Sequence, residues 1–424
     1  MSLAYQEIRA CRICGNPDLD PVLDLGSQYL TGVFPRNAEM QSKLTKGPLE
    51  LVKCRASGPR ERCGLLQLRH SFPSSEMYGA NYGYRSSLNR SMVEHLGSKV
   101  RRILARGILN AGDCILDIGS NDATLLKAYP RGDFHLIGMD PSGAKFLHHY
   151  PPHIKLAPDF FSAKAFDKAA SGRRAKIVTS IAMFYDLENP LQFVLQLRDI
   201  LADDGIWVFE QSYMPTMLET GSYDTVCHEH VEYYALSQIK WILDRAGMKI
   251  LDVELNSVNG GSFSVTAAKA SSPMAADEAG VTQLLTSEHA RLDTMAPYES
   301  FSRGAWRHRD ELTATVRGIN SRGETIVGYG ASTKGNVMLQ FCGLGREDLP
   351  CIADVNEDKF GCFTPGSGIP IVSEAQAHAM KPNYLLVLPW HFRENITQRE
   401  AAYLRSGGRL IFPLPEIAVV GGAG

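Results

Sequence analysis

The strand–turn–helix pattern at residues 114–126 constrains the fold of this chain more than any other feature. It begins with an apolar run, broken only by Asp117, that leads into Gly119 and then, with no proline, into a helix-like stretch at 123–129. A buried strand, a tight turn and a helix start form the opening unit of a doubly wound α/β sheet. A second apolar run ends in Asp140, about twenty residues after the turn, where such sheets place a carboxylate beside ribose hydroxyls. The pattern therefore predicts an α/β fold that binds an adenosine-containing ligand.

The residues of the turn distinguish between two kinds of adenosine ligand. A dinucleotide needs several glycines for its pyrophosphate to approach a helix N-terminus, but Gly119 stands alone and is followed by Asn121 and Asp122. A carboxylate at 122 would repel a pyrophosphate and suit the cationic amino-acid end of S-adenosylmethionine. The turn therefore favours a methyl-donor site over an ordinary strand–turn–helix without a ligand. The predicted cofactor residues, with Asp159 near the adenine ring, are Asp117, Gly119, Asn121, Asp122, Asp140, Asp159, Ala182, Met183 and Glu210.

Later segments continue this sheet and define a central domain. Residues 176–181 and 206–209 are predicted strands, and ligands of open α/β sheets lie beyond the carboxyl ends of such strands. Residues 251–255 and 262–269, joined across Asn-Gly-Gly, are predicted to form a hairpin that closes the sheet. We expect the S-adenosylmethionine-binding domain to span 76–270.

Length, charge and cysteine usage limit the class of protein. At 424 residues the chain is too long for one core, so two or three domains are expected. A net charge of −2 shows no basic excess for a nucleic acid or a membrane surface. The start of the chain has no signal-peptide pattern, and no apolar stretch approaches the length of a membrane span. Nine cysteines in a chain of this size fit a reducing compartment, so we expect a cytoplasmic protein.

The N-terminal segment 1–75 carries a four-cysteine pattern. A C-x2-C knuckle followed by glycine is joined forty residues later by a second, more widely spaced pair. Four thiolates can close a tetrahedral structural zinc site, and a short polar segment gains stability from such a staple. The alternative is four unligated cysteines. The predicted zinc ligands are Cys11, Cys14, Cys54 and Cys63.

The densest polar stretch of the chain, 222–235, contains His228, Glu229 and His230 in succession. Adjacent histidines on a strand or helix point to different faces, and the H-E-x-x-H metal spacing is absent. A histidine general base, with an acid and phenols nearby, therefore fits better than a metal site. The alternative is a surface histidine cluster without catalytic function.

Residues 271–424 restart the alternation of helix and strand. Apolar spacing at 281–295 and 312–319 predicts helices that bridge two sheets, and 325–337 repeats the strand–turn–helix theme. The glycines of this turn miss the dinucleotide pattern, so it is not predicted to bind NAD. Lys334 and the turn are candidates for contact with a sugar nucleotide, with aromatic stacking from a later strand end. A purely structural role for this half is the alternative.

Together these motifs resemble the S-adenosylmethionine-dependent C-methyltransferases that act on nucleotide-linked 4-keto-6-deoxyhexoses in deoxysugar biosynthesis. The resemblance covers nearly the whole chain in one order. The segments that carry it are the four-cysteine start with CGLLQL at 63–68, the tyrosine loop at 78–84, DIGSNDATLL at 117–126, SIAMFYDLENP at 180–190, CHEH at 227–230 and GYGASTKGN at 328–336. It implies a zinc-binding N-terminal domain, a central Rossmann-like class I methyltransferase sheet and a C-terminal Rossmann-like α/β domain. The sugar nucleotide would lie between the last two.

The resemblance also assigns roles to individual residues. It implies that His230 is the base and that Glu229 orients it or grips a sugar hydroxyl. It places an oxyanion-stabilising tyrosine at Tyr82, with Tyr78 as second choice. This chain departs from the family pattern in two positions, where Cys227 replaces a tyrosine and Asp186 replaces a histidine found in some members. The predicted substrate-binding residues are Tyr84, Asp186, Cys227, His228, Lys334, Trp390 and His391.

The predicted reaction is methylation of a sugar carbon, with C3 as the acceptor. His230 would remove the C3 proton, which the neighbouring carbonyl makes acidic, and a tyrosine hydroxyl would stabilise the enolate. Two alternatives are a sugar O-methyltransferase, which needs no keto group, and a non-catalytic protein that binds a sugar nucleotide or S-adenosylmethionine. We therefore expect the partner to be a small-molecule nucleotide-sugar substrate, and we expect no nucleic acid and no membrane as partners.

Overall fold

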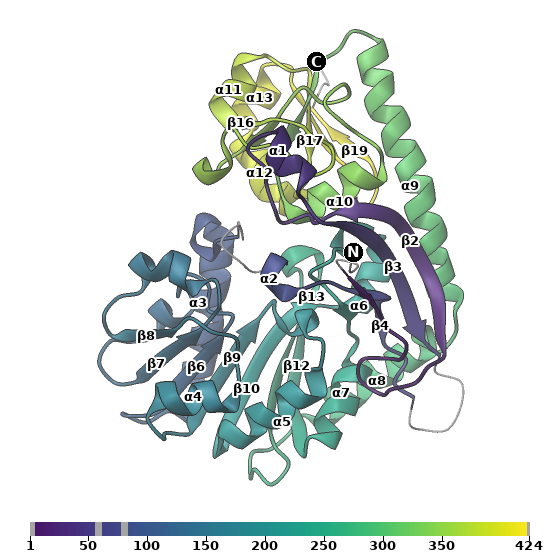
Figure 1. Cartoon of the computed structure of the whole chain (residues 1–424). Coiled ribbons are helices and arrows are strands. Elements are labelled where there is room, and N and C mark those ends of the chain that lie inside the picture. Colours follow the sequence, from purple (N-terminus) through teal and green to yellow (C-terminus); the bar gives the residue numbers. More distant parts are fainter. Residues whose placement is uncertain (1–4, 56–61, 78–83, 422–424) are drawn as a thin grey trace.

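A computed structural model describes residues 5–55, 62–77 and 84–421 (Figure 1). Within these residues the chain forms three larger sheets and one two-stranded pair, β1 (Gln6–Glu7) with β5 (His70–Ser71). Figure 1 places the strands of the N-terminal sheet beside both the central sheet and the C-terminal unit. The protein is therefore an α/β structure in which the N-terminal segment contacts both later parts.

The central sheet has seven strands, arranged as in a doubly wound fold that ends in a hairpin. All neighbouring pairs are parallel except β10 with β13 and β13 with β12, which confirms the C-terminal hairpin. Across the sheet the strands are β12 (Met248–Asn256), β13 (Ser262–Lys269), β10 (Leu201–Ser212), β9 (Ala175–Ile181), β6 (Cys114–Ile118), β7 (His135–Met139) and β8 (Ile154–Ala157).

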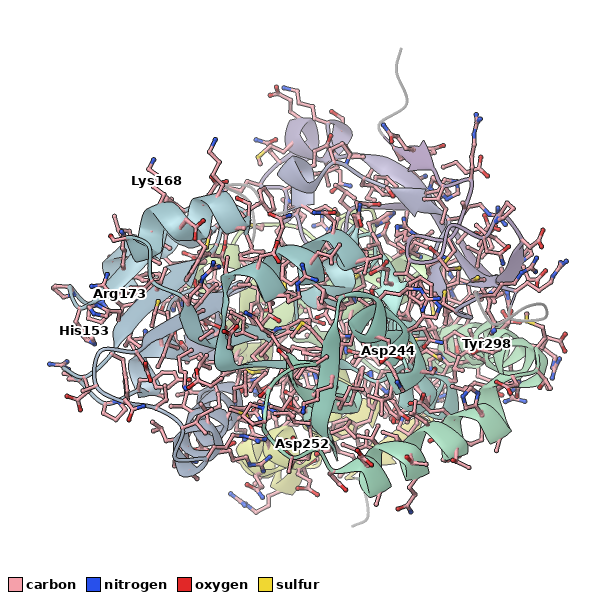
Figure 2. All side chains as sticks on the ribbon, turned by 90° about the horizontal axis from the view of Figure 1, so that it is seen from below. His153, Lys168, Arg173, Asp244, Asp252 and Tyr298 are labelled. Atoms are coloured by element: carbon pink, nitrogen blue, oxygen red, sulfur yellow. The ribbon has the colours of Figure 1, made fainter. Side chains whose placement is uncertain are left out.

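Helices cover both faces of the central sheet because each has one apolar side. In α3 (Arg90–Ala105) the buried residues include Leu96, Val100 and Ile103, and the side chain of Asn89 caps its first turn. The remaining elements are α4 (Ala163–Ala170), α5 (Pro190–Ile200), α6 (Met214–Thr220), α7 (Leu236–Arg245), η3 (Gly143–His149), η5 (Tyr223–Thr225) and η6 (Val258–Gly260). Figure 2 shows Lys168 at the molecular rim, where it projects from α4 into solvent.

The predicted helix at 123–129 is wrong. The chain forms only a 3-10 turn there, η2 (Leu126–Ala128). Asn121 and Ala123 have φ angles of 49° and 61°, in the left-handed region that a right-handed helix does not contain. The backbone directly after the turn therefore adopts a left-handed conformation that prevents a regular helix, and apolar periodicity does not predict it.

The N-terminal unit contains more β structure than its polar sequence indicated. Its sheet consists of β2 (Leu19–Tyr29), β3 (Lys46–Cys54), β4 (Leu66–Leu68) and β11 (Glu232–Tyr233). β11 belongs to the polar stretch that contains the histidines, and it pairs antiparallel with β4. Two short helices, α1 (Ala38–Ser42) and α2 (Ser74–Met77), complete this unit. The N-terminal sheet is thus completed by a strand from a distant part of the sequence.

Two helices lead to the C-terminal unit, as the apolar spacing predicted. They are α8 (Glu278–Leu292) and the long α9 (Ala296–Ser321), which extends from the central sheet to the C-terminal unit in Figure 1. Among the described residues, no helix combines the length and apolar character needed to cross a bilayer.

The C-terminal unit is a second α/β sheet, and its strands β16, β15, β14, β17 and β18 are parallel. In order its strands are β16 (Ile371–Ser373), β15 (Ile352–Asp354), β14 (Ile326–Tyr329), β17 (Tyr384–Val387), β18 (Arg409–Phe412) and the antiparallel β19 (Ala418–Val420). Its helices are α10 (Thr333–Phe341), α11 (Glu374–Ala379), α12 (Arg393–Arg399) and α13 (Ala401–Arg405), with the 3-10 turn η8 (Trp390–Phe392).

The first turns of the two α/β units are built alike. In the central sheet the Asn121 N–H donates to Asp140 Oδ2 at 2.8 Å. In the C-terminal sheet the Ala331 N–H donates to Asp354 Oδ2 at 2.9 Å. Together with the parallel strands of each sheet, this shared bond gives both units a Rossmann-like character.

Candidate functional site

The glycine turn after β6 is tightly bent and lies against the end of β9. Gly119 has a φ of +73°, which favours glycine, and a Cβ at this position would lie 3.2 Å from the side chain of Met183. Met183 follows β9, so the turn and the next strand end close around the same space. Gly119, Ala182 and Met183 thus meet at one sheet edge, where the sequence placed the cofactor.

Asp140 is held in a fixed orientation beside this turn. One carboxylate oxygen accepts the N–H of Asn121, and the other accepts the N–H and the hydroxyl of Ser142 at 2.7 and 2.6 Å. The residue is buried at the tip of β7. A carboxylate fixed in this position is suited to a pair of ribose hydroxyls.

Asn121 and Asp122 bind the segment that precedes α3. Asn121 accepts the N–H of Ser86 at 3.0 Å and donates to the carbonyl oxygen of Tyr84 at 3.1 Å. Asp122 accepts the N–H of Ser87 at 3.2 Å. Although burial opposes it, hydrogen bonds from Ser87 and Thr124 keep the pKa of Asp122 below its ordinary value. The turn therefore carries a buried, ionised carboxylate, which suits a cationic ligand group.

Three other predicted cofactor residues have different surroundings. Asp117 accepts the Thr179 hydroxyl at 2.6 Å, and burial raises the pKa of Asp117 to about 7. Asp159 is exposed. The carboxylate of Glu210 is bound by three side chains, namely His95 Nε2 at 2.5 Å, Lys99 Nζ at 2.5 Å and Asn256 Nδ2 at 2.7 Å. Glu210 thus joins the end of β10 to α3.

His230 lies beyond the carboxyl ends of the strands and has a defined tautomer. Its Nδ1 is 2.9 Å from the carbonyl oxygen of Thr225. A carbonyl oxygen only accepts, so Nδ1 carries the proton and Nε2 carries the lone pair. The residues that share a small cavity with His230 are Tyr185, Ser212, Met214, Met217, Thr225, Glu232 and Tyr233. The imidazole therefore presents its basic nitrogen while its other nitrogen is anchored.

The surroundings of His230 keep it neutral. Burial, together with the positive charge of Lys334, lowers the pKa of His230 to about 4. At neutral pH the ring is therefore unprotonated and able to accept a proton.

The neighbours of His230 in the CHEH motif are separated in space. His228 is buried against Phe72, with ring centroids 4.6 Å apart, and burial lowers its pKa to about 4. Its Nε2 faces the carbonyl oxygen of Gly47 at 3.4 Å, so it packs on the N-terminal unit. Glu229 is also buried, which raises its pKa to about 7, and the Cys227 thiol donates to it at 3.9 Å.

Side chains of the C-terminal unit reach the same region. Lys334 Nζ donates to the carbonyl oxygen of Asn259 at 2.9 Å, and Trp390 Nε1 donates to Asp224 Oδ2 at 2.8 Å. Asp224 is fully buried, and its Oδ1 atom has no hydrogen-bond partner in the described part of the chain. His391 follows Trp390, and burial lowers its pKa well below the ordinary value. These contacts join the C-terminal unit to the region around His230.

Two predicted catalytic residues, Tyr78 and Tyr82, lie outside the described residues. Tyr84 is largely exposed, and its backbone binds Asn121 of the cofactor turn. Asp186 lies in the 3-10 turn η4 (Phe184–Asp186) after β9.

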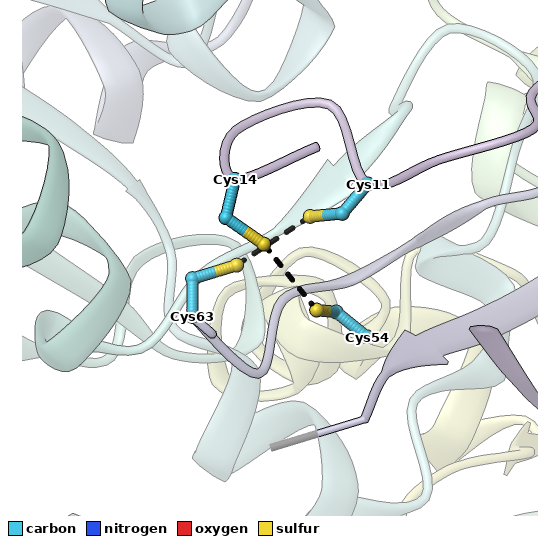
Figure 3. A group of neighbouring side chains, drawn as sticks. All are labelled: Cys11, Cys14, Cys54 and Cys63. Carbon is cyan, nitrogen blue, oxygen red and sulfur yellow. Dashed lines mark hydrogen bonds between the residues drawn. The ribbon is translucent and has the colours of Figure 1, made fainter. Parts of the chain in front are cut away.

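The four predicted zinc ligands converge (Figure 3). Their Sγ atoms all lie within 4.8 Å of one another, with Cys11–Cys63 at 3.4 Å and Cys14–Cys54 at 3.5 Å. Thiolates around a tetrahedral zinc lie roughly 3.8 Å apart, given Zn–S bonds of about 2.3 Å. All four are free cysteines rather than disulfides. The donor set fits Zn²⁺ in a closed structural site and offers no position for a substrate.

The sequence did not predict three residues near His230 and Trp390: Thr225, Tyr185 and Asp224. Thr225 acts through its backbone, which no side-chain motif records. Tyr185 and Asp224 lie inside the motif segments 180–190 and 222–235. Their polar side chains close to predicted strand ends could have identified them.

Several family models and known proteins are similar to this chain. Three family models match successive parts of the chain: a "zinc binding domain" at 11–78, a "Methyltransferase domain" at 88–253 and a "C-methyltransferase C-terminal domain" at 257–415. C-methyltransferase NovU of Streptomyces niveus is 31% identical over 418 residues, which cover 97% of each chain. Magnesium protoporphyrin IX methyltransferase of Synechocystis PCC 6803, solved with bound S-adenosylmethionine, is 15% identical. It has a TM-score of 0.32 and covers 42% of this chain and 79% of its own.

Proposed function

Because this chain belongs to the family of S-adenosylmethionine-dependent C-methyltransferases, we propose that it methylates C3 of a nucleotide-linked 4-keto-6-deoxyhexose, with His230 as the base. The observation that carries the proposal is the bond between His230 Nδ1 and the carbonyl oxygen of Thr225. It leaves Nε2 unprotonated beyond the strand ends that would hold the cofactor. A carbon nucleophile needs such a base, and a carbonyl beside the acceptor carbon makes its proton removable.

The residues of the glycine turn would hold the methyl donor. Bound there, S-adenosylmethionine supplies an electrophilic methyl group. Asp140 would bind the ribose hydroxyls, and the ionised Asp122 would bind the cationic amino-acid end. Gly119 lets the turn take its left-handed backbone close to the side chain of Met183.

His230 would take the C3 proton on Nε2, leaving an enolate across C3, C4 and the carbonyl oxygen. The imidazolium formed would keep its Nδ1–H bond to the carbonyl oxygen of Thr225. Returning the proton to solvent would restore the neutral ring, which the low pKa of His230 favours.

The C-terminal unit would bind the nucleotide. Lys334 lies at the start of α10, where a helix N-terminus and a cation both favour phosphate oxygens. Trp390 and His391 lie at the neighbouring strand end and provide aromatic surface for a base or a sugar. Both elements contact the region of His230 through Asn259 and Asp224. The substrate would therefore span the central and C-terminal units.

The test is mass spectrometry of reactions in D2O with dTDP- and GDP-linked 4-keto-6-deoxyhexoses. We expect the wild type to exchange C3–H for deuterium and to form a carbon–carbon bond. His230→Asn should lose roughly 10²–10⁴-fold in turnover while S-adenosylmethionine still binds. Near-normal turnover would exclude His230 as the base, and an O-methylated product without exchange would refute C3 as the acceptor. His289→Asn, at an exposed position on α8, is the matched control.

A further inference from the structure

The zinc-knuckle residue Arg12 is bound to the methyltransferase unit. Arg12 lies between the zinc ligands Cys11 and Cys14, yet its side chain is only 3% exposed. Its guanidinium donates to the carbonyl oxygen of Leu68 at 2.6 Å and to the Ser71 hydroxyl at 2.7 Å, both within the N-terminal unit. The remaining edge of the guanidinium faces a residue of the central unit.

That residue is Glu188, in the segment that follows β9. Arg12 Nε donates to Glu188 Oε2 at 3.1 Å, and the hydroxyl of Ser71 donates to the same oxygen at 2.8 Å. Arg12 and Ser71 are themselves hydrogen-bonded, so the three side chains form a closed triangle. The carboxylate is thus fixed in position although its side chain is 52% exposed.

The segment fixed by this triangle contacts the proposed base. Phe184 is buried among aromatic side chains of the sheet, including Trp207 at 5.4 Å between ring centroids. The next residue, Tyr185, places its ring against the imidazole of His230, with centroids 4.3 Å apart. The segment 184–188 is therefore held by the core at one end and by Arg12 at the other, with Tyr185 between them.

A second connection joins Arg12 to the other side of His230. The N–H of Leu68 donates to the carbonyl oxygen of Val231 at 2.9 Å, and β11 continues from Val231 as the partner of β4. Arg12 binds the carbonyl oxygen of this same Leu68. The backbone directly after His230 and the ring beside it therefore both depend on residues that Arg12 touches.

We propose that Arg12 is a positioning residue for methyl transfer, which holds Tyr185 and the backbone after His230 in place through Glu188 and Leu68. The zinc knuckle would then support the geometry of the base as well as the stability of the N-terminal unit. This inference rests on the proposed role of His230. A misplacement of a reacting group by about 1 Å can cost roughly 10²-fold in rate.

The test compares Arg12→Met with the wild-type full-length protein. We expect kcat to fall by about 10–100-fold while the zinc content and the Kd for S-adenosylmethionine stay within twofold of the wild type. Amide hydrogen exchange should accelerate in peptides that cover 184–188 and 227–233. Arg12→Lys, which keeps the charge toward Glu188 but not the guanidinium geometry, should recover part of kcat.

Arg69→Met is the matched control, because Arg69 lies in the same unit but pairs with Glu50 and Glu7 within that unit. It should alter neither kcat nor exchange at 184–188. Unchanged exchange in both segments of Arg12→Met, or equal effects of the two variants, would overturn the proposal.

Glu188→Gln provides a second variant that leaves the knuckle intact and should fold even if Arg12→Met does not. It should reproduce the faster exchange at 184–188 with an intact zinc site, and normal exchange there would also overturn the proposal. Hydrogen exchange needs no substrate. Failure of the wild type to act on a 4-keto sugar would therefore refute the proposed function and leave the role of Arg12 to be judged separately.

Discussion

The ring of Tyr185 stands edge-on to the imidazole of His230, with centroids 4.3 Å apart and an angle of 61° between the planes. A second contact holds the same imidazole, namely the hydrogen bond from its Nδ1 to the carbonyl oxygen of Thr225. One contact fixes which nitrogen is protonated, and the other restricts the tilt of the ring. Together they determine where Nε2 points.

Tyr185→Leu should remove the ring contact and lower kcat by about 3–10-fold, since an edge-to-face aromatic pair contributes about 0.5–1.5 kcal/mol. Tyr185→Phe keeps the ring and serves as the control for its orientation, so its kcat should exceed that of the leucine variant. Steady-state methyl transfer at saturating donor measures both. If both variants had the same kcat, the ring contact would not matter, and any loss relative to the wild type would be due to the missing hydroxyl.

Lys334→Met should raise the pKa of His230 toward its ordinary value, because the lysine cation disfavours the imidazolium. The imidazole is active when neutral, so the acid limb of kcat/KM should begin near pH 4 in the wild type and move to higher pH in the variant. A profile of kcat/KM from pH 4 to 8 measures the shift. Lys381→Met, at an exposed position of the C-terminal unit, should leave the limb in place.

Glu232→Gln should make the stability of the protein less dependent on pH. Burial raises the pKa of Glu232 to about 8, from an unfolded value of about 4.5, so the folded state holds a proton that the unfolded state releases in this range. The contribution of Glu232 is full below pH 4.5 and is lost as the pH rises through 8, at up to about 1.4 kcal/mol per pH unit. Urea unfolding of both proteins at pH 5, 6.5 and 8 measures it. Parallel curves for wild type and variant would contradict a buried, protonated Glu232.

Removal of zinc should destabilise the N-terminal unit. Elemental analysis should find one zinc per chain in the wild type, and Cys54→Ser should lose most of it and lower the Tm by about 10 °C or more. Prolonged chelation of the wild type should have the same effect. Cys362→Ser, a buried cysteine far along the chain in the C-terminal unit, should keep the metal. Equal metal content in wild type and Cys54→Ser would exclude the four-cysteine site.

The glycine turn and the zinc knuckle were predictable because the residues that define each of them lie within a short segment. Gly119 with its neighbours specifies a strand, a turn and a ligand class, and the C-x2-C knuckle specifies two thiolates at a suitable angle. The helix expected after the turn failed for a local reason as well, since the left-handed backbone at Asn121 and Ala123 interrupts it.

The separation of His228 from His230 could not be predicted from the motif they share. Residues two apart on an extended strand would point to the same side, but the chain turns at 228–229, where the His230 N–H donates to the carbonyl oxygen of Cys227 at 3.1 Å. Which unit each side chain meets then depends on the pairing of β11 with β4. That pairing joins residues more than 160 positions apart, and nothing in the local sequence encodes it.

The sequence by itself determined the doubly wound sheet with its closing hairpin, the methyl-donor class of ligand, the four zinc ligands and the family, because each depends on residue types at fixed spacing. Tertiary structure alone decided that Thr225 sets the tautomer of His230, that Glu210 is bound by α3, and that Arg12 reaches Glu188. These contacts join backbone carbonyls and side chains from different units. Their partners are chosen by how the sheets pack against one another, which spacing along one chain does not specify.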